Sequence, residues 1–268
     1  MSPSAPIGVF DSGLGGLSVL HEIRQLMPHE SLCYIADSHY APYGEKPHTL
    51  ICQRSIVCVD WLIEQGAKAI VVACNTATAA AIGPLRARYT LPIIAMEPAI
   101  KPAGEITRTG RVGVLATAGT LSSKKYESLL RQHARHISVI SQACPGLVEV
   151  IESGDFSSVA LRELLDQYLA PLRQAQIDTL ILGCTHYPLI RSLITERAGE
   201  GVAVVESGSA VARRLQQQLA ERDLLNLQAK PSPLRCWSSG ELQTQQSLLQ
   251  SVWGAPLLLH ALPTFSYS

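Results

Sequence analysis

The sequence has no excess of charge of either sign. Its 22 lysines and arginines balance 22 aspartates and glutamates, so the formal net charge of the 268 residues is zero. A nucleic-acid binder needs a basic surface to meet the phosphate backbone, so the composition argues against nucleic acid as a partner. An anionic substrate would have to find its positive partners locally, in backbone amides and helix N-termini.

Long apolar runs are also absent. None approaches the roughly 18 residues of a membrane-spanning helix, and the opening residues, MSPSAPIGVF, lack the basic segment of a signal peptide. The seven cysteines are odd in number and include no CxxC pair, which disfavours a disulfide framework. We therefore expect a cytoplasmic protein with reduced thiols and no membrane partner.

The most informative stretch runs from Ala69 to Thr78 and has the sequence AIVVACNTAT. The apolar run Ala69–Val72 is typical of a strand that a parallel sheet buries on both faces. Cys74 follows at the carboxyl end of that strand, where open α/β sheets bind their ligands. Asn75 and Thr76 can cap the helix that continues from there.

The same arrangement occurs a second time in Thr179–Tyr187, whose sequence is TLILGCTHY. Here Cys184 follows the apolar run, and Thr185 and His186 come next. Two cysteines at equivalent strand ends predict one site that is approached from two sides. A helix N-terminus behind each sulfur would favour the thiolate.

A glycine-rich turn is repeated in the same way. The strand Pro6–Phe10 leads into Asp11–Gly16 (DSGLGG) and then into a helix over Leu17–Met27, a combination typical of an anion-binding corner. The strand Val112–Leu115 leads into Ala116–Thr120 at a similar distance before the second cysteine.

These repeats predict an α/β fold made of two similar doubly wound parallel-sheet domains. A pseudo-twofold axis would relate the domains, and the active site would lie in the cleft between them. The first domain is expected to comprise residues 1–98 and 208–268, because the tail has no counterpart and should pack back; the second comprises residues 99–207.

The remaining pattern supplies the other elements of both halves. Strands are expected at Leu32–Ala36, Pro92–Met96, Ile137–Ser141, Val202–Val205 and Leu234–Trp237. Helices are expected at Thr49–Gln65, Ser122–His133, Leu147–Ser153, Asp155–Gln174, Ser209–Arg222 and Glu241–Trp253, with Ser207 or Ser209 as a cap. The glutamine-rich QQQ and QTQQ stretches are expected to be solvated helix faces.

Two thiols facing each other across a cleft allow three kinds of chemistry. One thiolate can remove a proton from carbon while the other thiol donates one. Alternatively, Cys74, Cys184 and His186 could bind zinc, although Cys-x-His alone is a weak signal. A redox pair is the third alternative, but it requires the sulfurs to approach to bonding distance.

Six motifs together resemble one family. DSGLGG, PYGEK, ACNTAT, LATAGT, CPGLVEVIESG and LGCTHYPL are similar to those of glutamate racemases, within the wider aspartate/glutamate racemase superfamily, and span Gly8 to about Ser209. The resemblance implies an enzyme that uses neither pyridoxal phosphate nor a metal and interconverts L- and D-glutamate for peptidoglycan synthesis. The resemblance is also compatible with a homodimer.

The resemblance also implies a role for individual residues. Cys74 and Cys184 would be the acid/base pair, one for each face of the α-carbon. Asp11 would assist Cys74, while Glu152 and His186 would assist Cys184. Substrate would be held by Asp11, Ser12, Tyr43, Gly44, Asn75, Thr76, Thr117, Thr120, Thr185 and His186.

Pattern alone leaves simpler roles open for several of these residues. Asp11 could be only a helix cap, and His186 could be a hydrogen-bonded structural histidine. Glu152 could be solvated, and Tyr43-Gly44 could be turn chemistry after Pro42. The rival functions are an aspartate racemase, another isomerase or a decarboxylase on the same halves, a non-catalytic module that binds dicarboxylates or amino acids, and a zinc protein.

Overall fold

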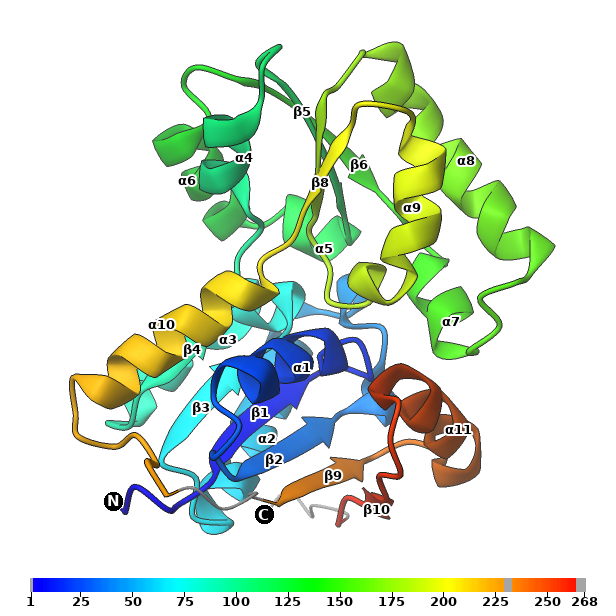
Figure 1. Ribbon diagram of the computed structural model, residues 1–268. Coiled ribbons are helices and arrows are strands. Elements are labelled where there is room, and N and C mark those ends of the chain that lie inside the picture. Colours follow the sequence, from blue (N-terminus) through cyan, green and yellow to red (C-terminus); the bar gives the residue numbers. More distant parts are fainter. Residues whose placement is uncertain (1, 229–232, 264–268) are drawn as a thin grey trace.

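Two parallel β-sheets form the frame of the molecule (Figure 1). The computed structural model describes residues 2–228 and 233–263. The first sheet has the order β10-β9-β2-β1-β3-β4, and the second has the order β6-β5-β7-β8. Their strands are β1 (Ile7–Asp11), β2 (Leu32–Ala36), β3 (Ala69–Val72), β4 (Ile93–Ala95), β5 (Arg111–Ala116), β6 (Ser138–Ala143), β7 (Thr179–Leu182), β8 (Ala203–Val205), β9 (Leu234–Ser238) and β10 (Leu259–Ala261).

The strand order reveals the repeat. In each sheet the first strand along the chain lies between the second and the third, and the fourth pairs with the third, always in parallel. The last residue of β1, Asp11, therefore corresponds to the last residue of β5, Ala116. This arrangement confirms the predicted fold class of two similar parallel-sheet halves.

Helices cover both faces of each sheet. The first sheet carries α1 (Leu17–Leu26), α2 (His48–Glu64), α3 (Asn75–Arg88), α10 (Gly208–Ala220) and α11 (Leu242–Trp253). The second half carries α4 (Ile100–Ile106), α5 (Ala118–Leu121), α6 (Lys124–His133), α7 (Leu147–Glu152), α8 (Val159–Gln174) and α9 (Arg191–Ala198).

Side-chain alternation along the strands separates the cores of the two faces. Val9 packs into the core under α1 and α10, whereas the next residue, Phe10, packs into the core under α2 and α3. Val71 and Val72 divide in the same way on β3. A strand buried on both faces must be apolar at every position, which is why these strands were legible as continuous apolar runs.

The tail of the chain extends the first sheet. β9 pairs with β2, and β10 pairs with β9, both in parallel. Helix α11 buries Leu248 and Leu249 in the core that α1 also faces. The domain limits after residues 98 and 207 stay a prediction.

The two chain segments that cross between the halves are tied together. Ser207 Oγ donates a hydrogen bond to the Glu97 carbonyl oxygen at 2.5 Å. The expected cap is therefore absent, because Ser207 makes no side-chain hydrogen bond to the first turn of α10, and Ser209 lies inside the helix. Sequence pattern also gave no indication of α4 or α9.

Candidate active site

A narrow cavity lies where the two halves meet, and both cysteines line it. It measures about 280 Å³. Its lining is Ser12, Pro42, Tyr43, Gly44, Cys74, Asn75, Thr76, Thr117, Val148, Gly183, Cys184, Thr185 and His186. Asp11, Thr120 and Glu152 lie behind this lining and contact it.

Cys74 occupies the N-cap position of α3. Its backbone is extended, and its sulfur accepts a hydrogen bond from the Ala77 amide at 3.4 Å and lies 3.6 Å from Ser12 Oγ. The thiol itself therefore caps the helix, not Asn75 or Thr76, which lie inside it. Burial and the charge of Asp11 raise the pKa of the Cys74 thiol, whereas the two hydrogen bonds lower it. The effect of burial is the larger, so the pKa is raised overall. The expected bias toward thiolate is reversed here.

Cys184 has a different environment. Its sulfur lies 3.7 Å from His186 Nδ1, and His186 Nε2 lies 2.6 Å from Glu152 Oε1. A short 3₁₀ turn at Tyr187–Ile190 follows, and α9 begins only at Arg191. The predicted helix N-terminus behind this sulfur is therefore absent.

The His186–Glu152 pair is set to hold a proton. Burial opposes charging His186, but its contacts with Cys184 and Glu152 outweigh burial and hold its pKa well above the usual value. Burial likewise raises the pKa of Glu152, but the hydrogen bond and charge of His186 and the Leu14 amide, 2.6 Å from Oε1, bring it below the usual value.

The glycine-rich turn binds carboxylates that belong to the chain itself. The amides of Ser12 and Gly16 donate to the Asp11 carboxylate at 2.7 and 2.5 Å, and Thr185 Oγ1 donates to it at 3.2 Å. The Leu14 amide donates to Glu152. The predicted anion-binding corner thus exists, but its occupants are Asp11 and Glu152. Burial raises the pKa of Asp11, although His186 and the two amides oppose it.

The same turn also lets the second half approach closely. A Cβ atom on Gly15 would lie 2.4 Å from His186 Nδ1, and one on Gly13 would lie 2.4 Å from Glu152 Oε1. A side chain at either position would therefore displace Glu152 or His186. Of the sequence-predicted residues, Asp11, Glu152 and His186 are therefore brought together on this one turn.

Hydroxyl groups from both halves form a closed ring at one end of the cavity. Thr76 Oγ1 lies 2.8 Å from Thr117 Oγ1 and 3.1 Å from Thr120 Oγ1, and the last two are 3.0 Å apart. Gly44 lies against Thr117, since a Cβ atom there would approach the Thr117 Cβ to 2.7 Å. The ring joins the start of α3 to the start of α5.

Asn75 is the polar group in the cavity that has nothing to bind. Its side chain is 4% exposed, and neither Nδ2 nor Oδ1 has a partner within the part of the chain that the structure describes. A buried carboxamide without partners is costly, about 1–3 kcal/mol. Its free donor and acceptor indicate a ligand that completes them.

Comparison with known proteins agrees with this geometry. Residues 7–215 match the Asp/Glu/Hydantoin racemase family. A curated glutamate racemase from Ectopseudomonas mendocina is 52% identical over 96% of this chain and 97% of its own length. The chain belongs to the glutamate racemase family.

Solved structures of glutamate racemases superpose over the whole molecule. Isoform RacE1 from Bacillus anthracis has a TM-score of 0.89 and 34% identity, with 97% of each chain covered. The Escherichia coli glutamate racemase, crystallised with L-glutamate and the activator UDP-MurNAc-ala, has a TM-score of 0.85 and 30% identity, covering 98% of this chain and 100% of that one. The resemblance stated from the six motifs is confirmed.

Sequence reasoning missed part of the surroundings of this racemase site. The Tyr43 hydroxyl donates to Asp37 Oδ2 at 2.6 Å, and Arg54 forms a buried ion pair with Asp37 at 2.7 Å. Asp37 was legible only as the end of a strand, and nothing in the sequence marked Arg54.

Within residues 2–228 and 233–263, no group of three or more His, Cys, Asp or Glu is placed to hold a metal ion.

Proposed function

We propose that this protein is a cofactor-independent glutamate racemase that supplies D-glutamate for peptidoglycan synthesis. The observation that carries the proposal is the pair of thiols, one from each half, that line a single cavity with separate groups for handling protons. One thiolate removes the α-proton from one face of the carbon, and the opposite thiol donates a proton to the other face.

The two ends of the reaction hold their protons differently. Cys74 keeps its proton, because its pKa is raised by burial and by Asp11. On the other side, His186 holds a proton beside Cys184, with Glu152 as its counter-ion. Asp11 assists Cys74, and His186 with Glu152 assists Cys184.

The polar lining suits an amino acid with two carboxylates. Hydroxyl and amide donors stabilise the charge that develops next to the α-carbon, and Asn75 offers a donor and an acceptor that are free. Ser12, Tyr43, Gly44, Thr76, Thr117, Thr120 and Thr185 complete the proposed substrate contacts. The complex of the Escherichia coli glutamate racemase with L-glutamate supports this choice of substrate.

Substrate access requires the two halves to separate. The cavity of about 280 Å³ is lined by residues of both halves and is smaller than the roughly 300–1,000 Å³ of most ligand pockets, so we infer that an amino acid enters only when the halves separate. We infer that the crossings near Glu97 and Ser207 act as the hinge, since the chain passes between the sheets there.

Assembly and location extend the proposal. No helix in the described part of the chain is long and apolar enough to cross a lipid bilayer. A homodimer, a cytoplasmic location and the absence of nucleic-acid and membrane partners remain predictions.

Proton exchange at the α-carbon tests the proposal directly. The protein, treated with a chelator, is incubated in deuterium oxide with D-glutamate and, separately, with L-glutamate, and NMR follows deuterium incorporation and inversion. Cys74→Ser and Cys184→Ser should each lower racemisation by at least about a thousandfold, because the alcohol is a far weaker acid and base at neutral pH.

Other results would overturn parts of the proposal. Exchange of aspartate in place of glutamate would keep the mechanism and change the substrate. Saturable glutamate binding with no exchange in the unsubstituted protein would leave a binding module and reject the racemase.

A further inference from the structure

One glutamine of the tail is buried although the two residues before it are exposed. Gln245 lies on α11 within the QTQQ stretch and is 8% exposed, whereas Gln243 and Thr244 on the same turn are exposed. The expectation of a solvated face is therefore wrong at this position. A buried carboxamide needs partners for both its oxygen and its nitrogen.

The orientation of this carboxamide is set by Ser238, at the end of β9. Ser238 Oγ accepts a hydrogen bond from the Gly240 amide at 3.0 Å, so its own proton is free to be donated, and it is donated to Gln245 Oε1. The Gln245 nitrogen then faces the other way. The opposite orientation would aim the carboxamide oxygen at a carboxylate, which is repulsive.

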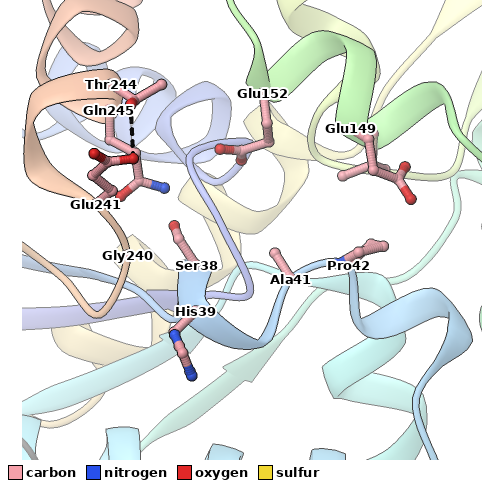
Figure 2. A pocket seen from close by; sticks show the side chains of 11 residues that line it. Ser38, His39, Ala41, Pro42, Glu149, Glu152, Gly240, Glu241, Thr244 and Gln245 are labelled. Atoms are coloured by element: carbon pink, nitrogen blue, oxygen red, sulfur yellow. Dashed lines mark hydrogen bonds between the residues drawn. The ribbon is translucent and has the colours of Figure 1, made fainter.

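That carboxylate is Glu152. Figure 2 shows the two side chains reaching from α11 and α7 into one pocket. The Leu14 amide and the His186 ring both bind Oε1 of Glu152. The other carboxylate oxygen, Oε2, is therefore left to interact with Gln245. Gln245 is among the groups that lower the pKa of Glu152, and the other acidic side chains in the pocket are Glu149 and Glu241.

We propose that Gln245 is a positioning residue of the racemase reaction: by holding Glu152, it fixes the His186 ring against Cys184. The inference rests on the proposed function and assigns a residue of the C-terminal tail to the same reaction. The chain of contacts runs from Ser238 through Gln245, Glu152 and His186 to Cys184, whereas Asp11, which assists Cys74, shares only the glycine-rich turn with Glu152. Removing Gln245 should therefore weaken proton transfer at Cys184 more than at Cys74.

Isotope effects separate the two thiols. Because the equilibrium constant between enantiomers is one, kcat/KM must be equal in the two directions, so rates alone cannot assign a defect to one sulfur. The α-deuterium isotope effect can, because each enantiomer loses its proton to a different thiol. It is measured with α-deuterated L- and D-glutamate, and Glu152→Gln identifies the enantiomer that depends on Cys184.

Gln245→Met should lower kcat by about five- to tenfold with little change in KM, which is the loss expected for one buried hydrogen bond. It should also raise the isotope effect more for the enantiomer that Glu152→Gln affects than for the other. The matched control is Gln246→Met. Gln246 is the next residue of α11, and within the described residues its side chain bonds only to the backbone of Leu257 and Leu259. We expect the ratio of isotope effects to be unchanged in this control.

Two results would overturn the inference. One is a Gln245→Met enzyme whose isotope effects change equally for both enantiomers, and the other is a change that Gln246→Met reproduces. Should Gln245→Met fail to fold, Ser238→Ala replaces it: releasing Oε1 should give a smaller change for the same enantiomer, and no change would overturn the inference. An unsubstituted protein that exchanges no α-proton would instead reject the proposed function.

Discussion

The two thiols occupy equivalent strand ends, yet their surroundings have little in common. Cys74 starts a regular helix, accepts from an amide and touches a serine hydroxyl, with a buried carboxylate near by. Cys184 precedes a 3₁₀ turn and touches a histidine that pairs with a glutamate. A racemase must treat two mirror-image substrates alike, but it does not require mirror-image catalytic groups.

The difference shows which parts of the fold are repeated and which are not. The strands that place both sulfurs are buried on both faces and follow one order in the two halves. The groups proposed to move protons differ between the halves: Asp11 corresponds to Ala116, His186 stands where the first half has Thr76, and Glu152 comes from α7. The repeat therefore fixes the positions of the thiols, and residues that differ between the halves fix their chemistry.

The largest contrast should come from removing one partner of each thiol. His186→Asn should lower kcat by about a hundredfold, because asparagine cannot hold a proton between Cys184 and Glu152. Ser12→Ala should lower it by only about fivefold, because a 3.6 Å contact to sulfur is a weak hydrogen bond. Steady-state racemisation followed by circular dichroism measures both. Equal losses would mean that the two thiols are supported alike.

Gly15→Ala should have a smaller effect, on stability as well as on activity. The added methyl group overlaps the His186 ring, which we expect to cost about 1–3 kcal/mol in unfolding free energy and about tenfold in kcat. The control is Gly104→Ala in α4, where the nearest atom would lie 3.5 Å away. That variant should gain up to about 1 kcal/mol and keep its activity. Urea unfolding compares the two, and a harmless Gly15→Ala would refute the close contact.

The smallest effect should be the pH dependence of stability. The pKa of His186 is raised above 6.5, so its contribution is complete below about pH 6.5 and is lost as the pH rises through the folded-state pKa. The pKa of Glu152 is lowered below 4.5, so its contribution is complete above about pH 4.5 and is lost as the pH falls through the folded-state pKa.

The difference in unfolding free energy between the unsubstituted protein and His186→Asn should therefore be largest between about pH 4.5 and 6.5. The corresponding difference for Ser12→Ala should be flat over the same range. Urea unfolding at a series of pH values measures both curves. A difference for His186→Asn that does not change with pH would contradict the pairing of protonated His186 with ionised Glu152.

Features that are marked by consecutive residues could be predicted from the sequence, whereas features that depend on distant contacts could not. The strands and both cysteines were legible because a strand buried on both faces leaves a continuous apolar run. Helix α9 was not, since RSLITERA buries only Ile194 and Ala198, and α4 contains Pro102 and Gly104, which suggest a break. Gln245 was misassigned because its carboxamide bonds to Ser238 at the end of β9, a tertiary contact that the QTQQ pattern does not mark.

The three-threonine ring has a consequence for affinity. The hydroxyls of Thr76, Thr117 and Thr120 satisfy one another, so none of the three is left unpaired where the halves meet. If a substrate carboxylate binds these hydroxyls as proposed, it must break this ring and gains only the difference between charged and neutral hydrogen bonds. In that case the ring competes with the substrate: it weakens binding and, by the same amount, eases the release of product.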